Sequence, residues 1–190
     1  MKICLISGSL RQDSFNTRLL LQLADTLAPG MQGDFLNPSD MRLPLFDEDL
    51  ENDPATLALV TPWHARVASA TGVLIACPEY NGQPTAFLKN LVDWITRLPY
   101  LDQAYANPFA GKPVLLCSAS TGWSGGALGL VHARALLAYV GATVIAPTVC
   151  VPYAPQAWSD LGYAFSPTQE ATAEYALAQW TALCHASAVG

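Results

Sequence analysis

Short apolar runs, rich in Val, Ile and Leu, recur along the 190-residue sequence, and each is too short to form a helix. Strands that are covered on both faces have this composition, because neither face meets water. The runs therefore predict parallel strands at residues 2–7, 72–77, 113–118 and 142–146. A weaker strand is expected at about 33–36, where one Phe and one Leu lie among polar residues, and it would be an edge strand.

Helical patterns lie between these runs. Apolar residues at positions 20, 23, 24 and 27 keep the spacing of one helix face, and Pro29-Gly30 ends the pattern. Asp53-Pro54 and Thr61-Pro62 each place a capping residue before Pro, which predicts a short helix and then a longer one up to Ala70. Further helices are expected at residues 85–97, 126–140 and 168–185.

Alternating strands and helices of this kind form a doubly wound α/β sheet, because parallel connections are right-handed and place helices on both faces. We expect five strands in the order 2-1-3-4-5, within one domain that spans residues 1–190. Such sheets bind ligands outside the carboxyl ends of their strands. The loops after the first, third and fourth strands should therefore surround one crevice.

The composition of the chain argues against some classes of binding partner. The formal charge is -6, and the nine Lys and Arg residues are scattered, which argues against nucleic acid or an anionic membrane as a partner. The sequence has no apolar run of membrane-spanning length. Hydrophobic residues make up 52% and charged residues 13%, which favours subunit contacts.

The five cysteines form no Cys-x-x-Cys pair and are interpreted as buried, reduced thiols of a cytoplasmic protein, with a redox role left open for Cys77 and Cys117.

The first predicted strand ends in a polar loop. Ser9, Arg11, Ser14 and Asn16 surround a predicted helix N-terminus, where free backbone N–H groups and the helix dipole favour an anion such as phosphate. The loop has neither the Gly-Lys-Ser/Thr of a Walker loop nor a Gly-x-Gly. An ordinary strand-to-helix turn with Ser and Asn as caps remains the alternative.

The loop after the third strand carries Pro, aromatic and amide side chains. Residues 77–84 form a Pro-flanked loop with Tyr80 and Asn81, which suits a flat heterocycle whose edges meet backbone groups. The alternative is a plain turn in which Tyr80 packs in the core.

These motifs, in this order, resemble the NADPH-dependent FMN reductase family. The resemblance rests on Gly8-Ser9-x-Arg11-x-x-Ser14-x-Asn16, residues 78–82, Leu88-Lys89-Asn90 and Asp93-Trp94. It continues through residues 44–50, 111–113, 118–122 and 125–127 and covers about residues 2–150. Leu128 departs from it, since relatives often carry Arg there, and so do residues 83–87. The stretch with Tyr153, Trp158, Tyr163 and Phe165 matches no motif of the family.

The resemblance implies a flavodoxin-like fold and a homodimer or homotetramer with FMN at a subunit edge. It implies an oxidoreductase that passes hydride from NADPH or NADH through FMN to a small acceptor such as a quinone, free flavin, azo dye or chromate. It also implies three groups of cofactor-binding residues. Ser9, Arg11, Ser14 and Asn16 would hold the phosphate; Pro78, Glu79, Tyr80, Asn81 and Gly82 would line the isoalloxazine; Ser118, Ser120 and Gly122 would form a third wall.

Flavin chemistry needs binding and orientation rather than a reactive side chain, so no catalytic residue and no metal ligand is named. His64, His132 and His185 lack the spacing of metal ligands and are interpreted as surface or packing residues. Glu79 could act as a general acid, but hydrogen bonds that order its loop are favoured. Two other functions stay open: a non-enzymatic electron carrier or redox sensor, and a hydrolase or binding module for another phosphorylated metabolite.

Overall fold

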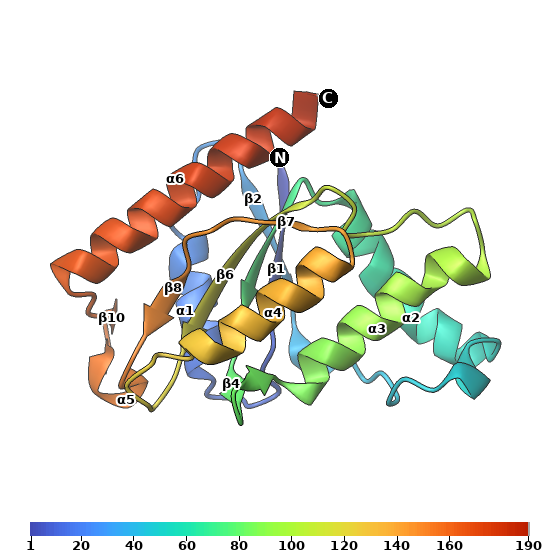
Figure 1. The fold of residues 1–190 in the computed structure, drawn as a ribbon, viewed down its shortest axis with the longest axis horizontal. Coiled ribbons are helices and arrows are strands. Elements are labelled where there is room, and N and C mark those ends of the chain that lie inside the picture. The colour runs from blue at the N-terminus through green and yellow to red at the C-terminus, as the bar shows by residue number, and fades with distance from the viewer. Residues whose placement is uncertain (190) are drawn as a thin grey trace.

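The computed structural model describes residues 1–189 and contains a central parallel sheet with helices on both faces (Figure 1). The strand order is β2-β1-β3-β6-β7, and β8 also pairs with β6. Every pair in this sheet is parallel, which confirms the doubly wound class. The strands are β1 (Lys2–Ser7), β2 (Gln32–Leu36), β3 (Gly72–Ala76), β6 (Pro113–Ala119), β7 (Thr143–Val144) and β8 (Val149–Val151).

The expected count of five strands is wrong, because two short strands, β7 and β8, occupy the place beside β6 where one strand was expected. β7 pairs with the start of β6, and β8 pairs with its end. Between them the chain leaves the edge at Ile145 and Ala146, just before Pro147. The Arg134 guanidinium donates to the carbonyls of Val144, Ile145 and Ala146 at 3.1, 2.6 and 2.9 Å. This side chain satisfies the backbone groups that the interrupted strand leaves unpaired.

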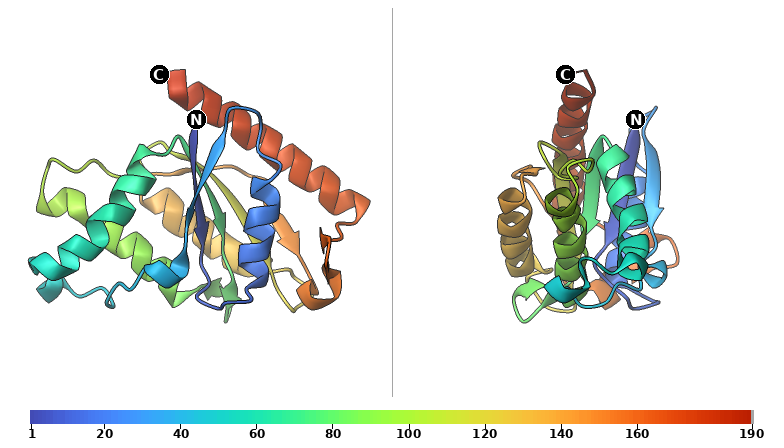
Figure 2. Two further views of the ribbon diagram at one scale, coloured as in Figure 1. Left: turned by 180° about the vertical axis from the view of Figure 1, so that it is seen from behind. Right: turned by 90° about the vertical axis from the view of Figure 1, so that its right-hand side faces the viewer.

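The sheet separates two hydrophobic cores. Helices α1 and α6 pack on one face, where Leu20 and Trp180 are fully buried, and Figure 2 shows both helices from behind. Helices α2, α3 and α4 cover the other face, where Trp94 is fully buried. The helices are α1 (Phe15–Ala24), α2 (Pro54–Ser69), α3 (Ala86–Leu101), α4 (Ala127–Tyr139), the short α5 (Ala154–Ala157) and α6 (Pro167–Val189).

The expected break in the second helical region is wrong, since α2 runs through Pro62. Pro62 has no N–H to donate to the Ala58 carbonyl, which weakens the helix locally. Val60, His64 and Val67 are nevertheless buried on the side of α2 that faces the core. Tertiary packing of this face outweighs the local signal, as it does for most helices in proteins.

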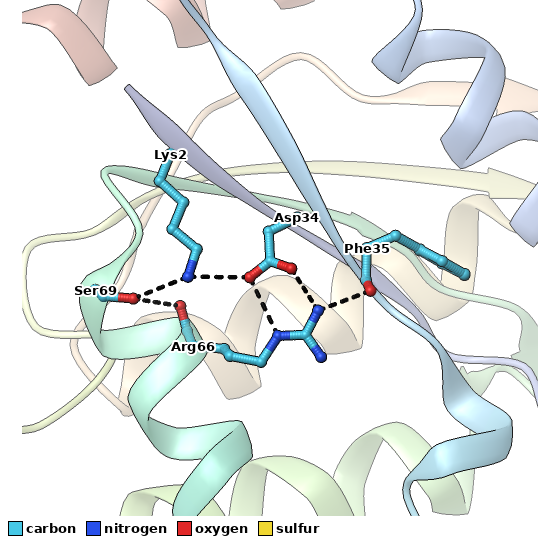
Figure 3. Close-up of polar contacts among 5 residues, drawn as sticks. All are labelled: Lys2, Asp34, Phe35, Arg66 and Ser69. Carbon is cyan, nitrogen blue, oxygen red and sulfur yellow. Dashed lines mark hydrogen bonds and ion pairs between the residues drawn. The ribbon is translucent and has the colours of Figure 1, made fainter.

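The edge strand β2 is tied to α2 by an ion-pair cluster (Figure 3). Arg66 forms two hydrogen bonds to the Asp34 carboxylate and a third to the Phe35 carbonyl at 2.8 Å. Lys2 Nζ lies 3.1 Å from Asp34 Oδ2 and donates to Ser69 Oγ. These contacts explain how a strand with few apolar residues holds its place in the sheet.

Part of the stretch that carries Tyr153, Trp158, Tyr163 and Phe165 forms a small hairpin, which packs on α1. Its strands are β9 (Trp158–Ser159) and β10 (Gly162–Tyr163). Tyr163 packs edge-on against Trp158, and its hydroxyl donates to the Phe15 carbonyl at 3.1 Å. Gln22 pairs with both backbone groups of Tyr163. The hairpin therefore buttresses the helix that follows the first polar loop.

Candidate functional site

A cavity of about 140 Å³ lies at the carboxyl ends of β1, β3 and β6. The three loops that the sequence singled out converge there, as the doubly wound topology requires. Eight of the residues expected at the site line the cavity: Ser9, Arg11, Ser14, Asn16, Pro78, Glu79, Tyr80 and Ser120. Phe15, Ala119 and Thr121 also line it, although no role at the site was expected for them from the sequence. All three directly follow or precede a named residue, so adjacency was the only signal for them.

The first loop presents hydroxyls and one guanidinium at the N-terminus of α1. Ser14 caps the helix, and its Oγ accepts from the Thr17 N–H at 3.2 Å. Ser9 Oγ accepts from the Arg11 N–H at 3.2 Å, which shapes the loop. The Arg11 guanidinium lies over the Phe15 ring and, within residues 1–189, forms no ion pair with an acid. The loop therefore offers an unneutralised cation beside a helix N-terminus, where anions bind.

Asn16 joins the first loop to the third. Its Nδ2 donates to the Ala119 carbonyl at 2.7 Å, and its Oδ1 accepts from the Ala119 N–H at 3.0 Å. The side chain is 5% exposed, so these bonds are shielded from water. Asn16 was expected to hold a phosphate, but its acceptor and one of its donors are occupied by this backbone clamp.

The loop after β3 is a tight hairpin, whereas a loop without strands was expected there. Its strands are β4 (Glu79–Tyr80) and β5 (Gln83–Pro84), joined by Asn81 and Gly82 at φ 53° and 74°. Asn-Gly is the dipeptide that two-residue hairpins with both φ values positive prefer, so a local signal was present. The cavity is lined by Tyr80 and Glu79 but not by the two residues at the hairpin tip.

Helix α4 holds this hairpin from the other side. Gly126 at the N-cap position has no side chain to cap the helix, and Glu79 Oε2 accepts from the Gly129 N–H at 2.8 Å instead. Near the tip, His132 Nδ1 lies 2.7 Å from the Gly82 carbonyl oxygen. Glu79 thus satisfies one N–H group at the N-terminus of α4, while the Ala127 N–H donates to the Ser124 carbonyl at 3.2 Å.

Thr85 connects the second loop to the first. Its hydroxyl donates to the Gly8 carbonyl at 2.6 Å and accepts from the Leu88 N–H, which caps α3. The residue was predicted only as the start of a helix. The hydrogen bond from Thr85 to Gly8 joins the first two loops directly, and the Thr85 side chain is buried.

The third wall is formed by Ser120 rather than by Ser118 or Gly122. Ser118 is fully buried against Gly126, where an added Cβ would lie 2.0 Å from the Ser118 Oγ. Among the described residues, that hydroxyl has no hydrogen-bond partner. Gly122 donates its N–H to Ser120 Oγ at 3.2 Å and so orients the serine that does line the cavity.

The cysteines near this edge are poor candidates for thiolate chemistry. Burial raises the pKa of Cys77 to about 12, and burial raises the pKa of Cys117 well above its usual value. Both thiols therefore stay protonated at neutral pH, whereas reactive cysteines have lowered pKa values.

Comparisons with known proteins show the family of this chain. Residues 1–156 match the family described as NADPH-dependent FMN reductase. A quinone reductase from Escherichia coli strain K12 is 37% identical over 145 residues, which cover 76% of this chain and 73% of the relative. A 2-hydroxy-1,4-benzoquinone reductase from Burkholderia is 34% identical over 140 residues, which cover 74% of this chain and 72% of the relative.

One solved structure has a similar fold and superposes on this chain with a TM-score of 0.75. It is FerB, a flavoenzyme NAD(P)H:(acceptor) oxidoreductase from Paracoccus denitrificans, with 27% identity over 97% of this chain and 95% of the other. The fold, the converging loops and the match over residues 1–156 lead to one conclusion. The chain belongs to the NADPH-dependent FMN reductase family and is an FMN-dependent NAD(P)H oxidoreductase of flavodoxin-like fold.

Proposed function

We propose that this chain binds FMN in the cavity at the carboxyl ends of β1, β3 and β6 and reduces a quinone or a related small acceptor. The observation that carries the proposal is the convergence of eight expected residues on that one cavity. The relatives named as quinone reductases support the acceptor class. NADPH or NADH would be the electron donor.

The first loop fits a phosphate ester. Ser9, Ser14 and Arg11 supply hydroxyls and a positive charge beside the free N–H groups of α1, which is the donor set that phosphate prefers. Asn16 contributes mainly by holding Ala119 in place, although its second Nδ2 hydrogen remains available. In this proposal Arg11 carries most of the phosphate affinity, because it is the one charged residue of the set.

The second and third loops fit a flat ring. Pro78, Glu79 and Tyr80 would form one wall and Ser120 another, while Asn81 and Gly82 shape the hairpin. Ser118 and Gly122 would act behind the wall, through packing and through Ser120. A cavity of about 140 Å³ is smaller than the roughly 300 Å³ of typical ligand pockets. Part of the ring would therefore lie against the open surface of the hairpin, where donor and acceptor can reach it in turn.

The side chains act by binding and orientation. Bound FMN would supply the ring that accepts hydride and passes electrons on. Arg11 would fix the phosphate end, and Glu79 would keep the hairpin against α4 through the Gly129 N–H. In this proposal the side chains bind and orient the flavin, and no residue is assigned a catalytic role.

A homodimer or homotetramer is part of the proposal. Leu128, Val131 and Tyr139 lie along α4 and are 54%, 60% and 91% exposed, which is unusual for apolar side chains on one helix. A cavity of about 480 Å³ lies between α3 and α4, and its lining includes Tyr100 and Tyr139. A second copy of the chain packed on this face would cover both features. The test is the molecular mass of the protein in solution. A monomer at micromolar concentration would contradict the proposed oligomer.

We further propose that the 190 residues form one FMN-binding domain that works in the cytoplasm. All five cysteines are free thiols, which suits a reducing compartment. Within the described part of the chain, no helix combines the length and the apolar character needed to span a bilayer.

The deciding experiment is a visible spectrum of the protein after incubation with FMN and removal of free FMN, followed by NADPH without oxygen. A flavin spectrum that bleaches with NADPH and returns when a quinone is added is the expected result. Retained colour that NADPH does not bleach would favour an electron carrier or redox sensor. A colourless protein would overturn the proposed FMN site and favour another phosphorylated ligand.

A further inference from the structure

The β4–β5 hairpin has little intrinsic stability. Each strand has two residues, and Pro84 has no N–H to donate, so the hairpin's own ladder supplies few hydrogen bonds. Isolated hairpins are at best marginally stable in water, even when they are longer. Yet Tyr80 lines the cavity, so the hairpin has to be held in one place. Contacts from outside the hairpin must supply that constraint.

Those contacts come from the first half of α4, which lies against the hairpin (Figure 1). Glu79 reaches the Gly129 N–H at the base of the hairpin, and His132 reaches the Gly82 carbonyl at the tip. Gly129 and His132 are three residues apart and so lie on the same face of the helix. Leu128 packs over Gly82, since a Cβ added there would lie 3.1 Å from Leu128 Cδ2.

The contact with the Gly82 carbonyl determines which nitrogen of the neutral His132 ring carries the proton. A carbonyl oxygen can only accept, so Nδ1 must be the donor, and in the neutral ring Nε2 carries no proton. His132 is half-buried and does not line the cavity, so it has no direct contact with a ligand there. Its effect on the site would therefore pass through the hairpin.

We propose that His132 is a positioning residue, which anchors the tip of the β4–β5 hairpin and thereby sets the place of Tyr80 at the wall of the cavity. The assignment of this wall to the flavin rests on the proposed function. The anchoring itself does not, because the hydrogen bond belongs to the chain without a ligand. The two claims can therefore fail separately.

The test uses two substitutions that differ in the donor. His132→Leu keeps the bulk of the ring but removes the N–H, whereas His132→Asn keeps an N–H donor close to the position of Nδ1. His185→Leu, at an exposed histidine on α6, is the matched control. Hydrogen exchange at the Tyr80 and Gln83 amides is measured in the full-length protein without FMN, and the FMN dissociation constant is measured in parallel.

In His132→Leu we expect exchange at both amides to quicken by about tenfold and the FMN dissociation constant to rise by a similar factor. His132→Asn should restore most of both values, and His185→Leu should change neither. A role in general stability alone would quicken exchange throughout α4 and would not be rescued by Asn. Unchanged exchange in His132→Leu, or no rescue by Asn, would overturn the proposal.

The unmodified protein provides a second check, which matters if His132→Leu does not fold. The nitrogen NMR spectrum of the neutral His132 ring should show the proton on Nδ1, and a proton on Nε2 would contradict the assignment. If the unmodified protein fails to bind FMN, the proposed function fails. The exchange data on the protein without FMN would still decide the role of His132.

Discussion

The Asn16 side chain pairs with both backbone groups of Ala119, donating to the carbonyl at 2.7 Å and accepting from the N–H at 3.0 Å. Asn16→Ala should lower the free energy of unfolding by about 2–3 kcal/mol, because it leaves buried backbone groups unpaired. Urea unfolding of the protein without FMN measures this. Gln179→Ala, at an exposed site on α6, is the control and should cost under about 0.5 kcal/mol. Equal stabilities would show that the clamp is dispensable.

Arg11→Ala should weaken FMN binding by about tenfold to a hundredfold, because a charge-assisted contact with the phosphate is lost. Its side chain is exposed, forms no ion pair within residues 1–189 and lies over the Phe15 ring. Such an exposed contact contributes about 0.5–1 kcal/mol, so the melting temperature without FMN should fall by about 4 °C at most. Fluorescence titration with FMN gives the affinity. Lys89→Ala, which removes the same charge beside the cavity between α3 and α4, should bind FMN normally. Normal FMN affinity in Arg11→Ala would refute the phosphate site.

Glu79→Ala should destabilise the protein by about 1 kcal/mol, since the Gly129 N–H at the start of α4 loses its acceptor. Glu79→Gln keeps an acceptor and loses only the favourable charge at the helix N-terminus, so about 0.5 kcal/mol is expected. Thermal unfolding of the two variants compares them. If Glu79→Gln were as unstable as Glu79→Ala, charge rather than hydrogen bonding would dominate at this position.

The Asp34 cluster predicts a dependence of stability on pH. Hydrogen bonds from Arg66, aided by Lys2, hold the pKa of Asp34 below its ordinary value of 3.8. Because the pKa is lower in the folded state, this contribution is complete above about pH 5 and is lost as the pH falls through the folded-state value. Asp34→Asn should therefore be less stable by about 1 kcal/mol at pH 7, and the difference should shrink below about pH 4. Urea unfolding of both proteins at several pH values measures this difference in stability. A difference that did not change with pH would exclude the Asp34 carboxylate as the source of the pH dependence.

Local sequence patterns located most of the secondary structure and the cavity. The strand at residues 2–7 lies where its apolar run predicted it, and helices follow Thr85 and Gly126 as expected, although the first of them runs on to Leu101. The hairpin at Asn81-Gly82 was missed although its signal is local. The break expected at Pro62 was wrong, because burial of one face of α2 overrides a local penalty, and this burial depends on distant parts of the chain.

The amino-acid sequence was sufficient to predict the fold class, the three loops at one edge of the sheet and the hydroxyl and guanidinium groups of the first loop, for which we propose phosphate binding. Tertiary structure alone decided what each polar side chain does there. Asn16 finds its partner 103 residues away, and Glu79 finds its partner 50 residues away. No local pattern encodes such pairs, because they form only when the crossovers bring separate loops and α4 to the same end of the sheet.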